Sequence, residues 1–86
     1  MISSKQIKAA RVFLSWEQRD LAERSGLSLP TIQRMEKLGV ERSSAGNAQK
    51  VQGALEAGGV EFIPENGGGA GVRMRKQDPA AGMQAP

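Results

Sequence analysis

Two short helices joined by a tight turn are predicted for residues 18–36, QRDLAERSGLSLPTIQRME. Gly26 can take the left-handed conformation that ends a helix. Ser28 is a favoured cap for a following helix over about 29–37, which has Pro30 in its first turn. Because only about three residues separate the two helices, and a glycine lies at the turn, the segment is typical of a helix-turn-helix.

Another helix is expected before this motif, over about residues 4–14. Ser3 and Gln6 form an S-x-x-Q capping box at its start. A second box, Ser15 with Gln18, is expected to begin the first helix of the motif. The apolar side chains that recur at helical spacing in these three helices, and that form the candidate core, are Ile7, Ala10, Leu14, Leu21, Ala22, Ile32 and Met35.

After the motif, residues 39–46 are expected to form a polar loop. A fourth helix is expected over about 47–57, with Asn47 as its cap and Gly58 and Gly59 at its end. The apolar stripe of that helix consists of Val51, Ala54 and Leu55.

The character of the chain changes at Val60. Residues 60–63 favour a strand, and residues 71–75 alternate with period two, so we expect a β-hairpin. The predicted fold class is mostly α. It is expected to be a small four-helix helix-turn-helix domain (1–59) with a C-terminal β-hairpin (60–76) and a disordered tail (77–86).

The composition narrows the classes of function. The chain has 86 residues, without cysteine or histidine. A disulfide framework and a thiolate zinc site are therefore excluded, and the commonest general base is missing. We expect a protein that is not an enzyme and that uses no metal and no cofactor. No signal peptide or membrane-spanning apolar run is visible, so a cytoplasmic, nucleoid-associated protein is expected.

Charge is distributed unevenly along the chain. The net charge is +3, and residues 1–42 contain eight basic and five acidic side chains. Residues 43–65 contain one basic and three acidic side chains. A basic N-terminal half suits a polyanion such as nucleic acid.

Residues 18–36 resemble the XRE family of DNA-binding domains, the helix-turn-helix class of phage repressors and Cro-like proteins. The resemblance covers about residues 3–57, and ALEAGGVEFIPENGGGAGVRMR (54–75) looks like the end of short bacterial regulators of this type. It implies a sequence-specific transcriptional regulator that acts by occupying an operator, as a homodimer. The family pattern matches at Gln18, Leu21, Ala22, Gly26, Leu27, Ser28, Ile32 and Glu36.

In this class the second helix of the motif lies in the major groove of double-stranded DNA. Its early exposed positions here are Leu29, Pro30, Thr31, Gln33 and Arg34. Arginine can bond guanine and glutamine can bond adenine, whereas Leu29 and Pro30 are limited to apolar contacts such as thymine methyls. Thr31 can reach a phosphate or a thymine methyl. Taken without the motif, Gln33 and Arg34 would be ordinary solvated helix residues.

Contacts to the DNA backbone are expected at two further places. The resemblance implies a phosphate contact for Gln18, at the start of the first motif helix. Arg42, Ser43 and Ser44 follow the recognition helix and are expected to contact the backbone as well.

Some residues are expected to be structural. The resemblance suggests that Glu36 is the partner of Arg11 in an ion pair. Asp20 and Arg24 have the i,i+4 spacing of a helical ion pair. Trp16 is expected to pack over the junction of the first two helices.

Two questions stay open. The hairpin is expected to help form the homodimer, although it could instead pack within its own chain. Arg73, Arg75 and Lys76 are either a second phosphate-binding patch or the solvated face of an edge strand.

The alternative function is a protein-interaction module, an antitoxin or anti-activator that masks a protein partner and in which DNA binding is secondary. The apolar start of the recognition helix keeps that alternative open.

Overall fold

The computed structural model describes residues 2–64 and 67–75. The predicted tail and Lys76 lie outside this part of the chain. The predicted mostly-α fold with a hairpin after the helices is confirmed. The elements are α1 (Ser4–Phe13), α2 (Gln18–Ser25), α3 (Leu29–Leu38), a 3-10 helix η1 (Val40–Arg42), α4 (Ala45–Ala57), β1 (Val60–Ile63) and β2 (Gly71–Met74).

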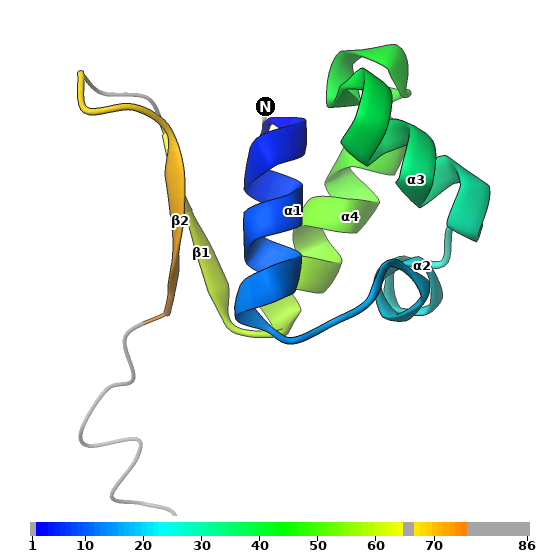
Figure 1. The fold of residues 1–86 in the computed structure, drawn as a ribbon, viewed down its shortest axis with the longest axis horizontal. Helices are drawn as coiled ribbons and strands as arrows, with labels where there is room; N and C mark the ends of the chain where they lie inside the picture. The colour runs from blue at the N-terminus through cyan, green and yellow to red at the C-terminus, as the bar shows by residue number, and fades with distance from the viewer. Residues whose placement is uncertain (1, 65–66, 76–86) are drawn as a thin grey trace, which may run out of the picture.

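The helices surround one small core. Figure 1 shows α1 and α4 side by side in the middle, with α2 and α3 on one flank and the hairpin on the other. Helix α3 therefore lies on the opposite side of the molecule from β1 and β2. Burial of apolar side chains from every helix stabilises this arrangement. The largest fully buried side chains are Ile7, Leu21, Ile32, Met35, Val40, Val51, Leu55 and Val60.

The hairpin packs against its own chain. Its strands are antiparallel, and Val60 lies opposite Met74 while Phe62 lies opposite Val72. Val60 is fully buried, and Phe62 and Val72 pack against the core. The apolar row of the hairpin is therefore largely covered by the helices, and Met74 is the one member left exposed.

The expected start of the second helix was wrong. Ser15 does not cap α2: it lies beyond the end of α1 with a φ of 57°, in the left-handed region. Its amide donates to the Val12 carbonyl at 3.0 Å, and the Trp16 amide donates to the Arg11 carbonyl at 2.9 Å, a pair of bonds typical of a helix end. The N-cap of α2 is Glu17, whose amide donates to the Asp20 carboxylate at 2.8 Å.

The expected start of the fourth helix was also wrong. Helix α4 begins at Ala45, two residues early, because the Ser44 hydroxyl accepts a hydrogen bond from the Asn47 amide at 3.1 Å. The segment 39–46 is not wholly polar loop either. Val40 in η1, which follows the end of α3, is completely buried and is part of the core.

Within the described part of the chain, none of the helices combines the length and the apolar character needed to cross a bilayer.

Candidate nucleic-acid interface

The turn between α2 and α3 sets the direction in which α3 leaves the core. Gly26 has a φ of 76°, and the Leu27 amide donates to the Ala22 carbonyl at 3.1 Å, so the turn closes α2 tightly. Ser28 then caps α3, since its hydroxyl accepts from the Thr31 amide at 3.2 Å. The predicted helix-turn-helix geometry is therefore present, and both predicted caps of this turn are confirmed.

Helix α3 has one buried face and one exposed face. Ile32 and Met35 are each only 1% exposed and anchor the helix in the core. Gln33 and Arg34, two of the residues predicted to contact bases, are exposed on the other face. In the first turn Pro30 is exposed and Leu29 is half-buried. The helix thus presents a solvent-facing surface that begins at its N-terminus.

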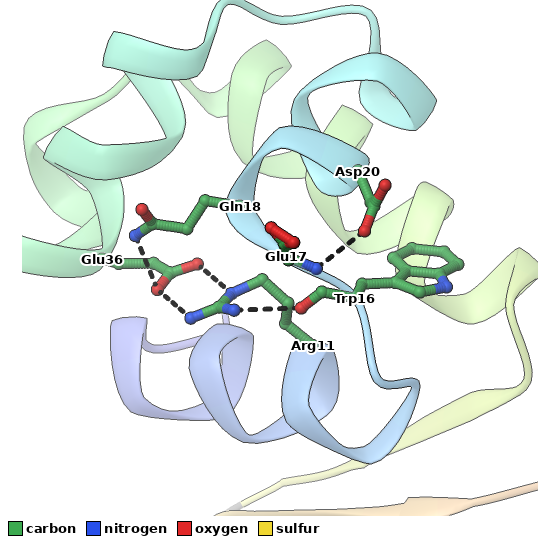
Figure 2. A network of polar contacts seen from close by, with 6 residues as sticks. All are labelled: Arg11, Trp16, Glu17, Gln18, Asp20 and Glu36. Atoms are coloured by element: carbon green, nitrogen blue, oxygen red, sulfur yellow. Dashed lines mark hydrogen bonds and ion pairs between the residues drawn. The ribbon is translucent and has the colours of Figure 1, made fainter.

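A buried ion pair ties α3 to α1. Arg11 Nε lies 2.9 Å from Glu36 Oε2, and Arg11 Nη2 lies 3.0 Å from Glu36 Oε1. The two side chains are only 14% and 5% exposed. Arg11 Nη1 also donates to the Trp16 carbonyl at 3.0 Å, so every polar end of the pair has a partner (Figure 2). The ion pair suggested by the resemblance is therefore present, and the bidentate geometry fixes α3 against α1.

Gln18 belongs to the same network. Its Nε2 donates to Glu36 Oε1 at 3.2 Å, across from the arginine (Figure 2). The carboxylates of Glu17 and Asp20 lie at the start of α2, and the Asp20 carboxylate accepts the Glu17 amide. Acidic groups at this helix end offset the positive end of the helix dipole. The predicted phosphate contact of Gln18 would thus have to come from a side chain that already holds a protein partner.

Two adjoining hollows lie between the motif and α1. They have volumes of about 380 Å³ and about 420 Å³ and share Arg11, Gln18 and Gln33 in their walls. Leu29 and Arg19 complete the first hollow, together with Glu17. The second hollow is completed by Lys8, Glu36 and Lys37.

Three basic residues that line the hollows were not predicted from the sequence to contact DNA: Lys8, Arg19 and Lys37. All three are exposed, and none forms an ion pair with another described residue. One signal in the sequence could have found Lys8, because it precedes Arg11 by three residues and so shares its side of α1. Arg19 and Lys37 adjoin Gln18 and Glu36, for which the resemblance implies a phosphate contact and the ion pair with Arg11.

Arg42, Ser43 and Ser44 lie apart from these hollows and line neither of them. Arg42 is exposed in η1, and Ser43 follows it half-buried. Ser44 is the cap of α4, so a structural role accounts for its hydroxyl.

The predicted ion pair of Asp20 with Arg24 is not formed. Asp20 instead caps α2, and the Arg24 guanidinium lies 4.5 Å from the centre of the Trp16 ring. A guanidinium over an indole face is a favourable cation–π contact. The Trp16 ring also packs against the core, and a Cβ on Gly58, at the end of α4, would lie 2.9 Å from it.

Arg73 and Arg75, the two hairpin cations among the described residues, have partners within the protein. Arg73 Nε lies 2.5 Å from Glu61 Oε1 on the outer face of the hairpin, and Arg75 Nη2 donates to the Glu56 carbonyl at 2.9 Å. This arrangement favours the edge-strand interpretation over a second phosphate patch.

Among the large apolar side chains that are exposed, Leu38 lies at the end of α3 and is 53% exposed, and the others lie on α1 and β2. Val12 and Phe13 at the end of α1 are 64% and 52% exposed, and Met74 of β2 is 46% exposed. Phe13 follows Arg11 by two positions, about 200° around the helix, so it faces away from α3.

No group of three or more acidic side chains in residues 2–64 and 67–75 is placed to hold a metal ion. A search of protein-family models and a search of curated proteins both found nothing that matches this chain.

Proposed function

We propose that this protein is a sequence-specific DNA-binding transcriptional regulator, in the cytoplasm, that acts by occupying an operator. The observation that carries the proposal is the division of α3. Its buried face is fixed by Ile32 and Met35, and its exposed face presents Gln33 and Arg34. An exposed helix of this kind fits the major groove, where these two side-chain types recognise adenine and guanine.

The Arg11–Glu36 pair supports the proposal energetically. A recognition helix that is held rigidly before binding loses little conformational freedom on DNA, so more of the contact energy remains as affinity. Lys8, Arg19 and Lys37 surround the same surface with positive charge that no ion pair of the described residues neutralises. Such side chains favour a phosphate backbone.

The test is a set of binding titrations at several salt concentrations. Wild-type protein is titrated with DNA from the region upstream of its own gene, with an operator selected from a random pool, and with unrelated DNA. Specific binding supports the proposal. Equal affinity for operator and unrelated DNA contradicts a sequence-specific regulator, and no binding to any DNA contradicts the whole proposal.

Two arginine variants separate base recognition from charge. Arg34→Ala is expected to reduce the preference for operator, because a bidentate arginine–guanine contact contributes about 1–3 kcal/mol of discrimination. Arg42→Ala is expected to weaken all DNA about equally and to leave the preference intact. If the two variants behave alike, the assigned orientation of α3 is wrong.

We further propose that the protein binds as a homodimer, through a surface next to the hairpin. Gln6 of α1 contacts Gly71 at the start of β2. Phe13 lies two helical turns beyond Gln6 on the same side, and Met74 lies three strand residues beyond Gly71. The displacement along α1 and the displacement along β2 are both about 10 Å. The exposed Phe13 and Met74 therefore lie at about the same distance from the Gln6–Gly71 contact, side by side on the two elements. A second copy docked on this surface would leave both recognition helices uncovered.

The alternative function, masking of a protein partner as an antitoxin or anti-activator, is favoured by the same exposed apolar side chains. The titrations above distinguish the two, because a partner-masking module, in which DNA binding is secondary, would bind operator no more tightly than unrelated DNA, or would bind neither.

A further inference from the structure

The first turn of α3 offers apolar atoms where a recognition helix usually offers polar ones. Pro30 has no amide hydrogen and is exposed. Leu29 is half-buried: it packs partly against the core and also lines the wall of a hollow. Thr31 is the polar residue of the three, but its Oγ1 lies 2.8 Å from the Ser28 hydroxyl, so it is engaged within the helix cap. The groups left facing outward are therefore mainly hydrocarbon.

These apolar positions precede the polar ones by one helical turn. Leu29 and Gln33 have i,i+4 spacing, and both line the same hollow. Pro30 and Arg34 have the same spacing, and both are exposed. Each polar side chain proposed to contact a base thus lies beside a hydrocarbon surface of α3.

The major groove has one apolar group to match such a surface, the 5-methyl group of thymine. Apart from the C5–H of cytosine, which the methyl group replaces in thymine, the other groups that specify a base there are donors or acceptors. Covering a donor or acceptor with hydrocarbon leaves it without a partner, at a cost of about 1–3 kcal/mol. A base pair beneath the first turn of α3 is consequently favoured if it turns a methyl group towards the helix.

We propose that Leu29 and Pro30 form a site for the 5-methyl group of a pyrimidine, so that the operator is recognised partly by its methyl groups. This inference rests on the proposed DNA-binding function and names the chemical group that the first turn of α3 selects. The preferred step places a thymine beside the adenine that Gln33 contacts.

The experiment replaces single thymines by deoxyuridine in an operator selected from a random pool with the wild-type protein. Deoxyuridine keeps every hydrogen-bonding group of thymine and removes the methyl alone. Losing one buried methyl is expected to weaken binding about fourfold at one or two positions of each half-site. Cytosine at those positions is expected to bind more tightly when it carries a 5-methyl group.

Protein variants assign the effect to the site. Pro30→Ala removes exposed ring atoms and adds an amide hydrogen in the first turn of α3, and its fold is checked by a thermal melt. In this variant, and in Leu29→Ala, deoxyuridine and thymine operators are expected to bind with affinities closer to one another. Gln33→Ala is the matched control, because it should lose the adenine preference and keep the full sensitivity to the methyl group.

Two outcomes overturn the inference. If wild-type protein binds its operator specifically but tolerates deoxyuridine at every position, the methyl site is wrong while the regulatory function stands. If it shows no specific DNA binding, the proposed function fails and the methyl site fails with it.

Discussion

The side chain of Gln6 joins the first helix to the last strand: its Nε2 donates to the carbonyl oxygen of Gly71 at 2.9 Å. The same nitrogen donates to the Ile63 carbonyl at 3.3 Å, and Oε1 accepts the Ser3 amide at 2.8 Å. Gln6 is 7% exposed, so these bonds lie away from solvent. One buried amide therefore completes the capping box of α1 and holds the loop end of the hairpin, where Ile63 pairs with Gly71.

Gln6→Ala is expected to lower the free energy of unfolding by about 1–3 kcal/mol, because two strand carbonyls and the Ser3 amide lose a partner. Hydrogen exchange should become faster in β1 and β2 than in α3. Urea unfolding and amide exchange measure the two effects. Lys5→Ala, an exposed neighbour, is the control and should change stability by no more than about 0.5 kcal/mol. Unchanged exchange in the hairpin would contradict this role of Gln6.

Replacement by alanine is expected to change the stability in opposite directions at two glycines, Gly53 within α4 and Gly58 at its end. A Cβ on Gly53 would meet no atom within 4 Å, so Gly53→Ala should raise stability by about 0.5–1 kcal/mol through its helix propensity. A Cβ on Gly58 would lie 2.9 Å from Leu14 Cδ1 and from Trp16 ring atoms. Gly58→Ala should therefore lower stability by about 1–3 kcal/mol. Thermal melts test the pair, and a stable Gly58→Ala would contradict the packing of Trp16.

The Arg11–Glu36 pair is expected to be costly to break. Arg11→Ala and Glu36→Ala should each lower the free energy of unfolding by about 3–5 kcal/mol, because each strands a buried charge. The exposed pair of Arg73 with Glu61 is the internal control, and Arg73→Ala should cost no more than about 1 kcal/mol. Denaturant unfolding of the variants checks this order. Equal small losses in all of them would show that the buried pair contributes little.

Lys8 and Lys37 are expected to contact DNA phosphates. Replacing both by alanine should reduce the steepness of the salt dependence of binding by nearly two units and leave the operator preference unchanged. Lys50→Ala is the control, because Lys50 is equally exposed but lies on α4 and lines neither hollow. Binding isotherms over a range of salt concentrations give both slopes. A double variant with the wild-type slope would exclude these lysines from the interface.

The dimer surface is expected to depend on Phe13 and Met74. Phe13→Glu and Met74→Glu should each yield a monomer in sedimentation experiments at concentrations where the wild type is a dimer. Leu38→Glu is the control, because Leu38 is 53% exposed but lies at the end of α3. Truncation after Gly59 is a poorer test, since it would remove the fully buried Val60 from the core. A wild-type monomer, or a dimer in both variants, would contradict the assigned surface.

Much of this fold could be predicted because its local signals are strong and lie close together in the sequence. The helix caps are an example, because each depends on residues no more than four positions apart. The structure contains the predicted capping box of Ser3 with Gln6, the C-cap at Gly26 and the N-cap at Ser28. The errors arose where two local patterns competed. Ser15 can cap a helix, yet the bonds that end α1 draw it into the left-handed region.

The site was harder to predict because its side chains meet across long stretches of sequence. Glu36 was placed opposite Arg11 by resemblance, since spacing alone does not bring α1 and α3 together. The same holds for Gln6 and Gly71, whose contact depends on where the hairpin folds back. Lys8 and Lys37 could join the candidate interface only once α1 and α3 were seen to flank one hollow.

The stability of the fold and the proposed recognition of DNA depend on different side chains of α3. Ile32 and Met35 hold the helix in the core, and Gln33 and Arg34 take almost no part in that packing. Substitutions at the two exposed positions should therefore leave the protein folded while altering which DNA it selects. A family of such proteins could acquire new operators by point mutation without first gaining stability, and duplicated copies could diverge in their targets from the first substitution onward.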